Sequence, residues 1–177
     1  MKKGSTFLGI DDARHNREKD RYTELVGAAY RGTKCLEDLR IGKIEVDGKD
    51  STTEIIRLYR KTESSHVKTI LLDGISFAGM NIPDLGEIHE KTSTPVMAIT
   101  DTQPDRERFR KAAEKAGSME NFEKTSPPHR LEVEGKIVYI HSRGMEKEME
   151  KEVMKTSVLN GRIPECIRVA DLLGKRL

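Results

Sequence analysis

Three short segments of the chain are apolar without alternation. They are residues 6–11, 67–73 and 95–100, which read TFLGID, VKTILLD and PVMAIT. Strands that are apolar on both faces are typical of a parallel sheet with helices on either side. Two longer segments, at 21–31 and 36–47, follow one another with no helix between them and predict an antiparallel extension. The pattern predicts an α/β domain with a mixed central sheet of about five strands and helices on both faces.

The apolar residues of the segment at 36–47 change from one face of the strand to the other partway along. Leu39 and Ile41 lie on one parity. Ile44 and Val46 lie on the other, and Gly42 stands between the two pairs. A β-bulge at Gly42 would return all four side chains to a single face, so we expect a bulge there.

Apolar residues at helical spacing predict helices at 50–61, about 82–91, 104–117, about 145–157 and about 165–175. Ser51, followed three residues later by Glu54, has the form of a capping box for the first helix. Asn81 is a candidate cap for the second. Residues 131–141 predict a hairpin around Gly135.

The composition is that of one ordinary globular domain. The 177 residues contain no linker, internal repeat or low-complexity tract, so residues 1–177 are expected to form one domain. No apolar run approaches the roughly 18 residues of a membrane span, and the N-terminal apolar stretch is too short for a signal peptide. We therefore expect a cytoplasmic location and no membrane partner. Cys35 and Cys166 match no metal-ligand pattern and are expected to be reduced thiols.

The charge of the chain leaves a nucleic-acid partner open. The formal net charge is +2, and acidic and basic residues are interleaved, which is typical of a solvated surface. The arginines at 106, 108 and 110 alternate with acids and read as a solvated helix face, with a phosphate track as the alternative.

Carboxylates stand at the ends of the buried segments. Asp11 and Asp12 end the first, Asp73 ends the second, and Asp101 follows the third. Ligands of such sheets bind at the carboxyl ends of the parallel strands, so these acids converge if the strands are neighbours. Converging carboxylates repel, and either one takes a proton or a cation lies among them.

Magnesium is the cation that such a group favours, because Mg²⁺ commonly takes one or two carboxylates together with water and phosphate. Metal-dependent cleavage of a phosphodiester is the chemistry that follows. The alternative is that an aspartate at a strand end only caps the next turn. Asp101, in TDTQPD, has the stronger appearance of turn chemistry. Asp12 is expected to point away from Asp11, because neighbouring residues of a strand face opposite ways.

Four motifs carry a resemblance to a known family. They are GIDD at 9–12, VDGKDST at 46–52, LLDGISFAGMNI at 71–82 and IPECIRVADLL at 163–173. The chain resembles a family of uncharacterised archaeal proteins that is distantly similar to endonuclease V. That similarity implies a ribonuclease H-like fold, in which the first strand lies between the second and the fourth. Endonuclease V cleaves nucleic acid near deaminated bases such as inosine and uses Mg²⁺.

The resemblance assigns roles to particular residues. Gly-Ile-Asp at 9–11 looks like the G-x-D that supplies one metal ligand, and Asp73 with Gly74 looks like the D-G that supplies the second. Asp11 and Asp73 would then bind Mg²⁺ or Mn²⁺. Pro164, Glu165, Arg168 and Asp171 match the C-terminal P-E-P-x-R-x-A-D helix in part. The helix reads as mainly structural, with Arg168 and Asp171 as partners of the acidic site.

The chain departs from endonuclease V at its catalytic glutamate, which precedes D-G by about twenty residues. Thr52 and Thr53 fall near that spacing, and the nearest acids are Asp50 and Glu54. Asp50, just before a helix, is the substitute that we expect to act as a third catalytic acid.

The parts that recognise the lesion are also different. VDGKDST replaces the proline- and tyrosine-rich wedge, and Gly79-Met80-Asn81 replaces a His-Pro-Arg segment. The late histidine falls on Met145, while His141 is nearby but out of register. These departures predict poor discrimination between inosine-containing and normal strands.

Three functions remain open at this stage. The first is a metal-dependent enzyme that hydrolyses phosphodiesters of DNA or RNA at Asp11 and Asp73. The second is a nucleic-acid-binding or regulatory protein that keeps the fold with reduced catalysis. The third is a hydrolase of small phosphoesters that uses the same crevice.

Overall fold

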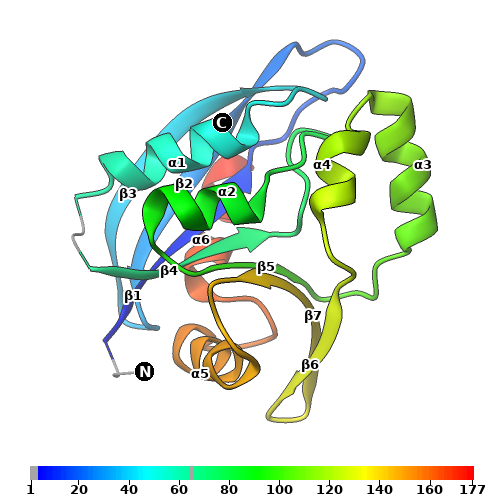
Figure 1. Cartoon of the computed structure of the whole chain (residues 1–177). Coiled ribbons are helices and arrows are strands. Elements are labelled where there is room, and N and C mark those ends of the chain that lie inside the picture. The colour runs from blue at the N-terminus through cyan, green and yellow to red at the C-terminus, as the bar shows by residue number, and fades with distance from the viewer. Residues whose placement is uncertain (1–3, 64–65) are drawn as a thin grey trace.

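The computed structural model describes residues 4–63 and 66–177. In this part of the chain, seven strands form one mixed sheet in the order β3-β2-β1-β4-β5-β7-β6 (Figure 1). The strands are β1 (Thr6–Asp12), β2 (Tyr22–Arg31), β3 (Cys35–Glu45), β4 (Val67–Asp73), β5 (Val96–Thr100), β6 (His129–Val133) and β7 (Lys136–Arg143). The helices are α1 (Ser51–Lys61), α2 (Leu85–Thr92), α3 (Arg106–Ala116), α4 (Met119–Lys124), α5 (Lys147–Ser157) and α6 (Glu165–Gly174).

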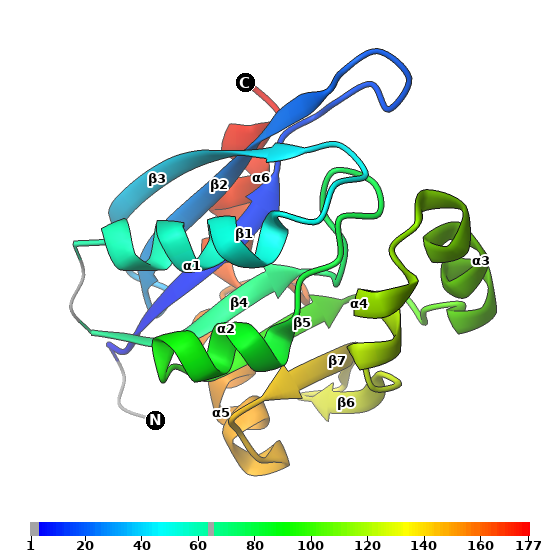
Figure 2. The same cartoon turned by 45° about the horizontal axis from the view of Figure 1, so that its top comes forward.

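Helices cover both faces of the sheet, as predicted. Helices α1 and α2 lie on one face, and α5 and α6 lie on the other (Figure 2). Alternate residues of β1 divide between the two sides. Leu8 and Ile10 pack in one cluster with Ile55 of α1, whereas Phe7 packs in another with Ile167 of α6. Both sides of β1 are shielded from water, which explains why its sequence does not alternate.

The order of the strands confirms the predicted position of the first one. β1 lies between β2, to which it is antiparallel, and β4, to which it is parallel. β5 continues the parallel part beyond β4. The hairpin predicted around Gly135 forms β6 and β7, and β7 pairs with the free side of β5. Because this hairpin joins the sheet, there are seven strands rather than about five.

The bulge predicted at Gly42 is wrong. The pairing of β3 with β2 is continuous at that point, and its register shifts near the other end of β3, between Ala29 and Tyr30 of β2. Leu39 packs on the side of α6, and Ile44 is buried on the side of α1. The two parities therefore point to opposite faces of β3: Ile44 is fully buried beneath α1, whereas Leu39 is partly buried and Ile41 is exposed on the other face.

Two predicted helix caps are also wrong. Ser51 and Glu54 form no capping box, because the α1 N-terminus has no such side-chain bond. The amide of Ser51 instead donates to Oδ1 of Asn81, at 3.0 Å. Asn81 therefore caps α1 and not α2. At α2 the cap is Asp84, whose carboxylate accepts a bond from the amide of Glu87.

Helices α3 and α4 form an arm beyond the carboxyl ends of β4 and β5 (Figures 1 and 2). The predicted helix ends at Gly117, as expected, but the short α4 that follows it was not predicted. The rings of Phe109 and Phe122 join the two helices, with their centroids 5.7 Å apart. Met80 and Ile82 pack in the same cluster, so the arm is fixed to the segment between β4 and α2.

Both cysteines are free thiols, as predicted. Cys35 is exposed, whereas Cys166 is buried in α6, and burial raises the pKa of its thiol to about 12. Within the described residues, no helix has the length and apolar character that a membrane span requires.

Candidate metal centre

Asp11 and Asp73 meet at the carboxyl ends of β1 and β4. The two strands are parallel neighbours, and Ile10 is paired with Leu72, so the next residue of each strand lies at the same edge. An open hollow forms there, which we call the acidic hollow. It is lined by Asp11, Asp12, Ala13, Arg14, His15, Asp73, Asp171 and Lys175. The predicted convergence of Asp11 with Asp73 is therefore present in the structure.

Close packing of α6 on β1 brings Asp171 to the same place. A Cβ atom at Gly9 would overlap the backbone of Cys166 and Ile167, and one at Gly174 would lie 3.0 Å from the carbonyl oxygen of Asp12. Glycine at these positions lets the helix lie directly on the strand. The glycine of the G-x-D motif is thus explained by helix packing, and the aspartate by the hollow.

Asp11 is the most deeply buried carboxylate of the acidic hollow, with 7% of its surface exposed. Its Oδ1 accepts one hydrogen bond, from the amide of Asp12 at 2.9 Å. Burial raises the pKa of Asp11 to about 8, and the carboxylates of Asp73 and Asp12 add to the shift, while the amide bond opposes it. At neutral pH Asp11 therefore holds a proton unless a cation replaces it.

Asp73 is half-buried, and no described residue donates a hydrogen bond to its carboxylate. Burial raises its pKa to about 6, and the charges of Asp171 and Asp101 act in the same direction. Lys175 opposes the shift. Its ammonium also pairs with Asp171 at 2.6 Å, so one lysine faces several acids at the mouth of the hollow.

Asp12 turns toward the segment between β4 and α2, as its parity predicts. Its Oδ2 accepts from the amide of Ala78 at 2.9 Å and lies 3.4 Å from Nδ1 of His15. Burial raises the pKa of this carboxyl, and the amide of Ala78 lowers it. Asp12 thus fixes a residue with positive φ beside the hollow, while its charge still acts on Asp11.

The structure separates the remaining predicted residues. Asp171 lies in the acidic hollow, whereas Arg168 pairs with Glu165 and does not line it. Asp101 is exposed and acts on Asp73 through its charge. Its backbone oxygen accepts a bond from Arg162 at 3.3 Å.

Asp50 is not brought to the other acids. Its carboxylate accepts from the amide of Glu45 at 3.2 Å and from Nδ2 of Asn81 at 2.6 Å. It does not line the acidic hollow. These bonds hold the loop between β3 and α1, so the geometry gives no support to Asp50 as the third catalytic acid.

A larger cleft adjoins the acidic hollow and shares Asp73 with it. We call it the side cleft. It is lined by Asp73, Gly74, Ile75, Ser76, Thr100, Thr102, Gln103, Pro104, Asp105, Arg106, Arg108, Phe109, Ala112, Pro128 and His141. The sequence did not predict this cleft, because its walls come from three segments far apart in the chain.

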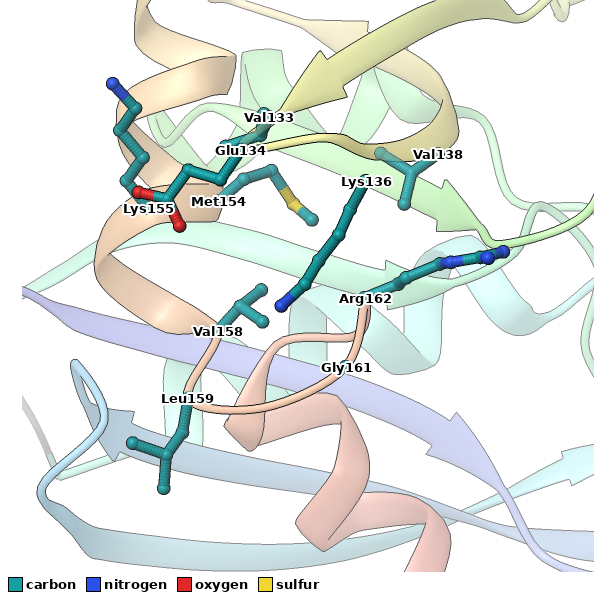
Figure 3. A pocket seen from close by; sticks show the side chains of 10 residues that line it. All are labelled: Val133, Glu134, Lys136, Val138, Met154, Lys155, Val158, Leu159, Gly161 and Arg162. Carbon is teal, nitrogen blue, oxygen red and sulfur yellow. The ribbon is translucent and has the colours of Figure 1, made fainter.

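A separate hollow lies between the β6–β7 hairpin and α5 (Figure 3). Val138, Met154 and Val158 line it, and the side chain of Lys136 extends across it, while that of Arg162 extends away from Met154 and Val158. It shares no lining residue with the acidic hollow or the side cleft. It therefore contributes nothing to the centre around Asp73.

The donor set of the acidic hollow fits one hard divalent cation. Among the described residues, no three His, Cys, Asp or Glu side chains form a group that could hold a metal ion. Two carboxylates are sufficient for Mg²⁺, which keeps several waters and takes substrate phosphate as a ligand. Asp11 and Asp73 are the two candidates. Together their carboxylates accept one hydrogen bond from the described residues, from the amide of Asp12 to Asp11.

The sheet order and the acids at its edge define a domain of the ribonuclease H-like type, the fold of endonuclease V. A family model described as Endonuclease dU matches residues 3–177, and the chain belongs to that family.

One relative by sequence and two solved structures show what the chain is similar to. A UPF0215 protein of Methanocaldococcus jannaschii is 32% identical over 99% of this chain and 95% of its own length. A protein of unknown function from Archaeoglobus fulgidus, 28% identical, has a crystal structure that matches 96% of both chains with a TM-score of 0.85. Endonuclease V of Ciona intestinalis, in complex with DNA containing an inosine, matches 97% of this chain and 84% of its own, with a TM-score of 0.60 and 12% identity. This last likeness shows the fold alone.

Proposed function

We propose that this protein is a metal-dependent endonuclease that cleaves a nucleic-acid strand beside a deaminated base, with the uracil of deoxyuridine as the first base to test. The observation that carries the proposal is the pair formed by Asp11 and Asp73. They lie at the ends of adjacent parallel strands, Asp11 buried and Asp73 half-buried, with raised pKa values and a single hydrogen-bond donor between them. The name of the family, Endonuclease dU, supplies the base.

Asp11 and Asp73 would hold Mg²⁺ or Mn²⁺. When bound, such an ion activates water and stabilises the charge that develops on a phosphodiester. The burial of Asp11 keeps the pair partly out of water, and this strengthens its attraction for a cation and a phosphate. Lys175, at the mouth of the hollow, supplies positive charge near the point where a phosphate would enter.

The side cleft gives room for a base next to the scissile phosphate. Enzymes that act at a particular base take it out of the stack and hold it in a pocket. Phe109 and Ile75 give this cleft apolar surface, while Thr100 and Gln103 supply polar groups. Asp73 belongs to both the cleft and the acidic hollow, so a base in the cleft lies beside the proposed metal.

A basic groove continues from the cleft. It is lined by Arg17, Asp105, Glu107, Arg108, Lys111, Ala112 and Lys115, of which Asp105, Arg108 and Ala112 also line the side cleft. Four cations face two carboxylates here. A run of positive charge leading to the centre is what the phosphates of a bound strand require.

The three arginines of α3 have different surroundings. Arg106 donates to the carbonyl oxygen of Thr125, and Arg110 pairs with Glu107. Arg108 has no carboxylate partner among the described residues and lines both the cleft and the groove. Arg108 is therefore the arginine of α3 that is available to bind a phosphate. Arg106 holds the fold, and Arg110 belongs to the solvated surface.

A nicking assay tests the proposal. Labelled oligonucleotides with and without deoxyuridine are incubated with Mg²⁺, Mn²⁺ or EDTA. We expect cleavage only with a metal, and Asp73→Asn should leave less than about one hundredth of the parent rate. Glu132→Gln removes a carboxylate from the exposed hairpin, where it pairs with Arg130, and should cleave as the parent does. Equal cleavage by the parent and by Asp73→Asn would show that this centre is not responsible.

The second candidate is a nucleic-acid-binding protein with reduced catalysis. It is favoured by one observation, which is that Asp50, the acid expected to be the third catalytic one, is hydrogen-bonded away from the acidic hollow. Strand binding without metal-dependent nicking in the same assay would favour this candidate.

A further inference from the structure

His141 is a buried histidine whose two ring nitrogens have different surroundings. It lies on β7, opposite Ala98 of β5, and is 4% exposed. Its Nδ1 is 2.9 Å from the carbonyl oxygen of Ser126, which lines a small hollow that shares His141 with the side cleft. The ring itself also lines the side cleft, and no described residue forms a hydrogen bond with Nε2.

The contact with Ser126 fixes the tautomer of the ring. A carbonyl oxygen only accepts, so Nδ1 must carry the proton that it donates, and Nε2 then has a free lone pair. Burial lowers the pKa of His141 to about 4, with the positive charges of Arg106 and Arg143 acting in the same direction, so the ring is neutral at pH 7. The neutral ring therefore has one acceptor nitrogen, and His141 belongs to the wall of the side cleft.

We propose that Nε2 of His141 faces the side cleft and accepts a hydrogen bond from the ring N–H that distinguishes a deaminated base from its parent. The inference rests on the proposed function and names the group that reads the base. Uracil has an N–H at the ring position where cytosine has a bare nitrogen. Hypoxanthine differs from adenine in the same way.

The acceptor discriminates because the normal base offers no proton at that position. With cytosine or adenine in the cleft, two lone pairs would face each other away from water, and a buried acceptor without a donor is costly. The missing wedge and His-Pro-Arg segment predicted little discrimination of inosine. His141 supplies a discriminating group by a route that the endonuclease V pattern does not contain.

Two substitutions separate this role from a structural one. In His141→Asn the side-chain amide lies near the position of Nδ1, so it can still donate to Ser126, but nothing replaces Nε2. In His141→Gln the longer side chain places its amide near the position of Nε2. If the ring only ties β7 to Ser126, His141→Asn should behave as the parent does.

The experiment compares the parent and both variants on oligonucleotides that contain deoxyuridine, deoxycytidine or 3-deazadeoxyuridine, in which the N3–H becomes a C–H. We expect the parent to prefer deoxyuridine to deoxycytidine by about a hundredfold or more, because a site built around a hydrogen bond rejects a ligand that lacks it. His141→Asn should lower that ratio by about tenfold or more, and His141→Gln should keep part of it. The deaza substrate should slow the parent and leave His141→Asn unaffected. The deaza arm needs no variant, so it shows whether the N3–H is read even if a substitution disturbs folding, and equal parent rates on both substrates would overturn the proposal.

The outcomes distinguish this inference from the function on which it rests. Metal-dependent cleavage with an unchanged ratio in His141→Asn and equal rates on the deaza substrate would overturn the role of His141 and leave the nuclease intact. If nothing is cleaved, the proposed function fails, and binding of the same oligonucleotides without metal decides the inference. A preference for deoxyuridine that His141→Asn removes would support it, and equal affinity of the parent for deoxyuridine and deoxycytidine would overturn it.

Discussion

Two groups of aspartates follow strands of the same sheet, and their surroundings are opposite. In the loop after β3, Asp47 accepts from the amide of Met80 and from Nε of Arg17, at 2.8 and 2.6 Å. Asp50, three residues on, accepts from Asn81 and a backbone amide. In the acidic hollow the two metal-ligand candidates have one donor between them, and their pKa values are raised.

The number of hydrogen bonds that a carboxylate accepts from the fold distinguishes a structural carboxylate from one that can bind a cation. A carboxylate that accepts hydrogen bonds from the fold is stabilised as an anion and needs no cation. One that is buried beside other anions must take a proton or a metal. We call Asp47, Asp50 and Asn81 the aspartate–asparagine cluster, and it stands for the first kind. Asp11 and Asp73 stand for the second.

The aspartate–asparagine cluster also joins the two segments that depart from endonuclease V. Asn81 contacts Asp50, the amide of Ser51 and the carbonyl oxygen of Glu45. Gly79 has a φ of +88°, and a Cβ atom there would overlap the Asp47 carboxylate. VDGKDST and Gly-Met-Asn therefore pack on each other as one unit.

Breaking the aspartate–asparagine cluster should have the largest effect on stability. Asn81→Ala removes three hydrogen bonds at a fully buried position, and should lower the free energy of unfolding by about 3 kcal/mol. Asn121→Ala is the control, because Asn121 makes a single bond, to the carbonyl oxygen of Ile82, and should cost about 1 kcal/mol. Urea unfolding measures both. Equal losses would show that the cluster is no more than an ordinary surface contact.

A divalent cation should stabilise only through the acidic hollow. Mn²⁺ at a hundred times its dissociation constant should add about 2.7 kcal/mol to the parent protein, seen as a rise in Tm. Asp11→Asn and Asp73→Asn should each abolish the rise. Asp50→Asn should lower the Tm without metal and keep the rise in full, since its carboxylate lies outside the hollow. If Mn²⁺ left the Tm of the parent protein unchanged, the proposal of a metal centre would be wrong.

The sequence predicted the parts of this comparison that depend on strand order and missed those that depend on distant contacts. Asp11 and Asp73 could be placed because buried strands, their direction and the motifs around them are all local signals. Asp50 was read as catalytic because nothing near it in the chain shows that Asn81, thirty-one residues away, binds its carboxylate. The wrong cap at Ser51 has the same cause. The acceptor on His141 depends on one carbonyl oxygen fifteen residues away, which no local pattern contains.

The smallest expected effect is on the slope of the free energy of unfolding against pH. It compares Asp11 with Asp50 without any metal. The pKa of Asp11 is about 8 in the fold, against an ordinary value of 3.8, and that of Asp73 is about 6. Below the ordinary value both states hold the proton. Above it the unfolded chain loses the proton that the folded chain keeps, so the free energy of unfolding falls as pH rises toward the folded pKa.

Between pH 6 and 8, Asp11 alone should account for a fall of up to about 1.4 kcal/mol per pH unit. Asp11→Asn cannot ionise, so its stability should fall less steeply over this range, and the two curves should diverge as pH rises. Asp50→Asn should run parallel to the parent, because it leaves Asp11 in place. Urea unfolding in EDTA at half-unit steps from pH 5 to pH 8.5 measures the three curves. Groups that do not interact with Asp11 contribute equally to both curves, so parallel curves for the parent and Asp11→Asn would mean that Asp11 ionises in the fold near its ordinary pKa.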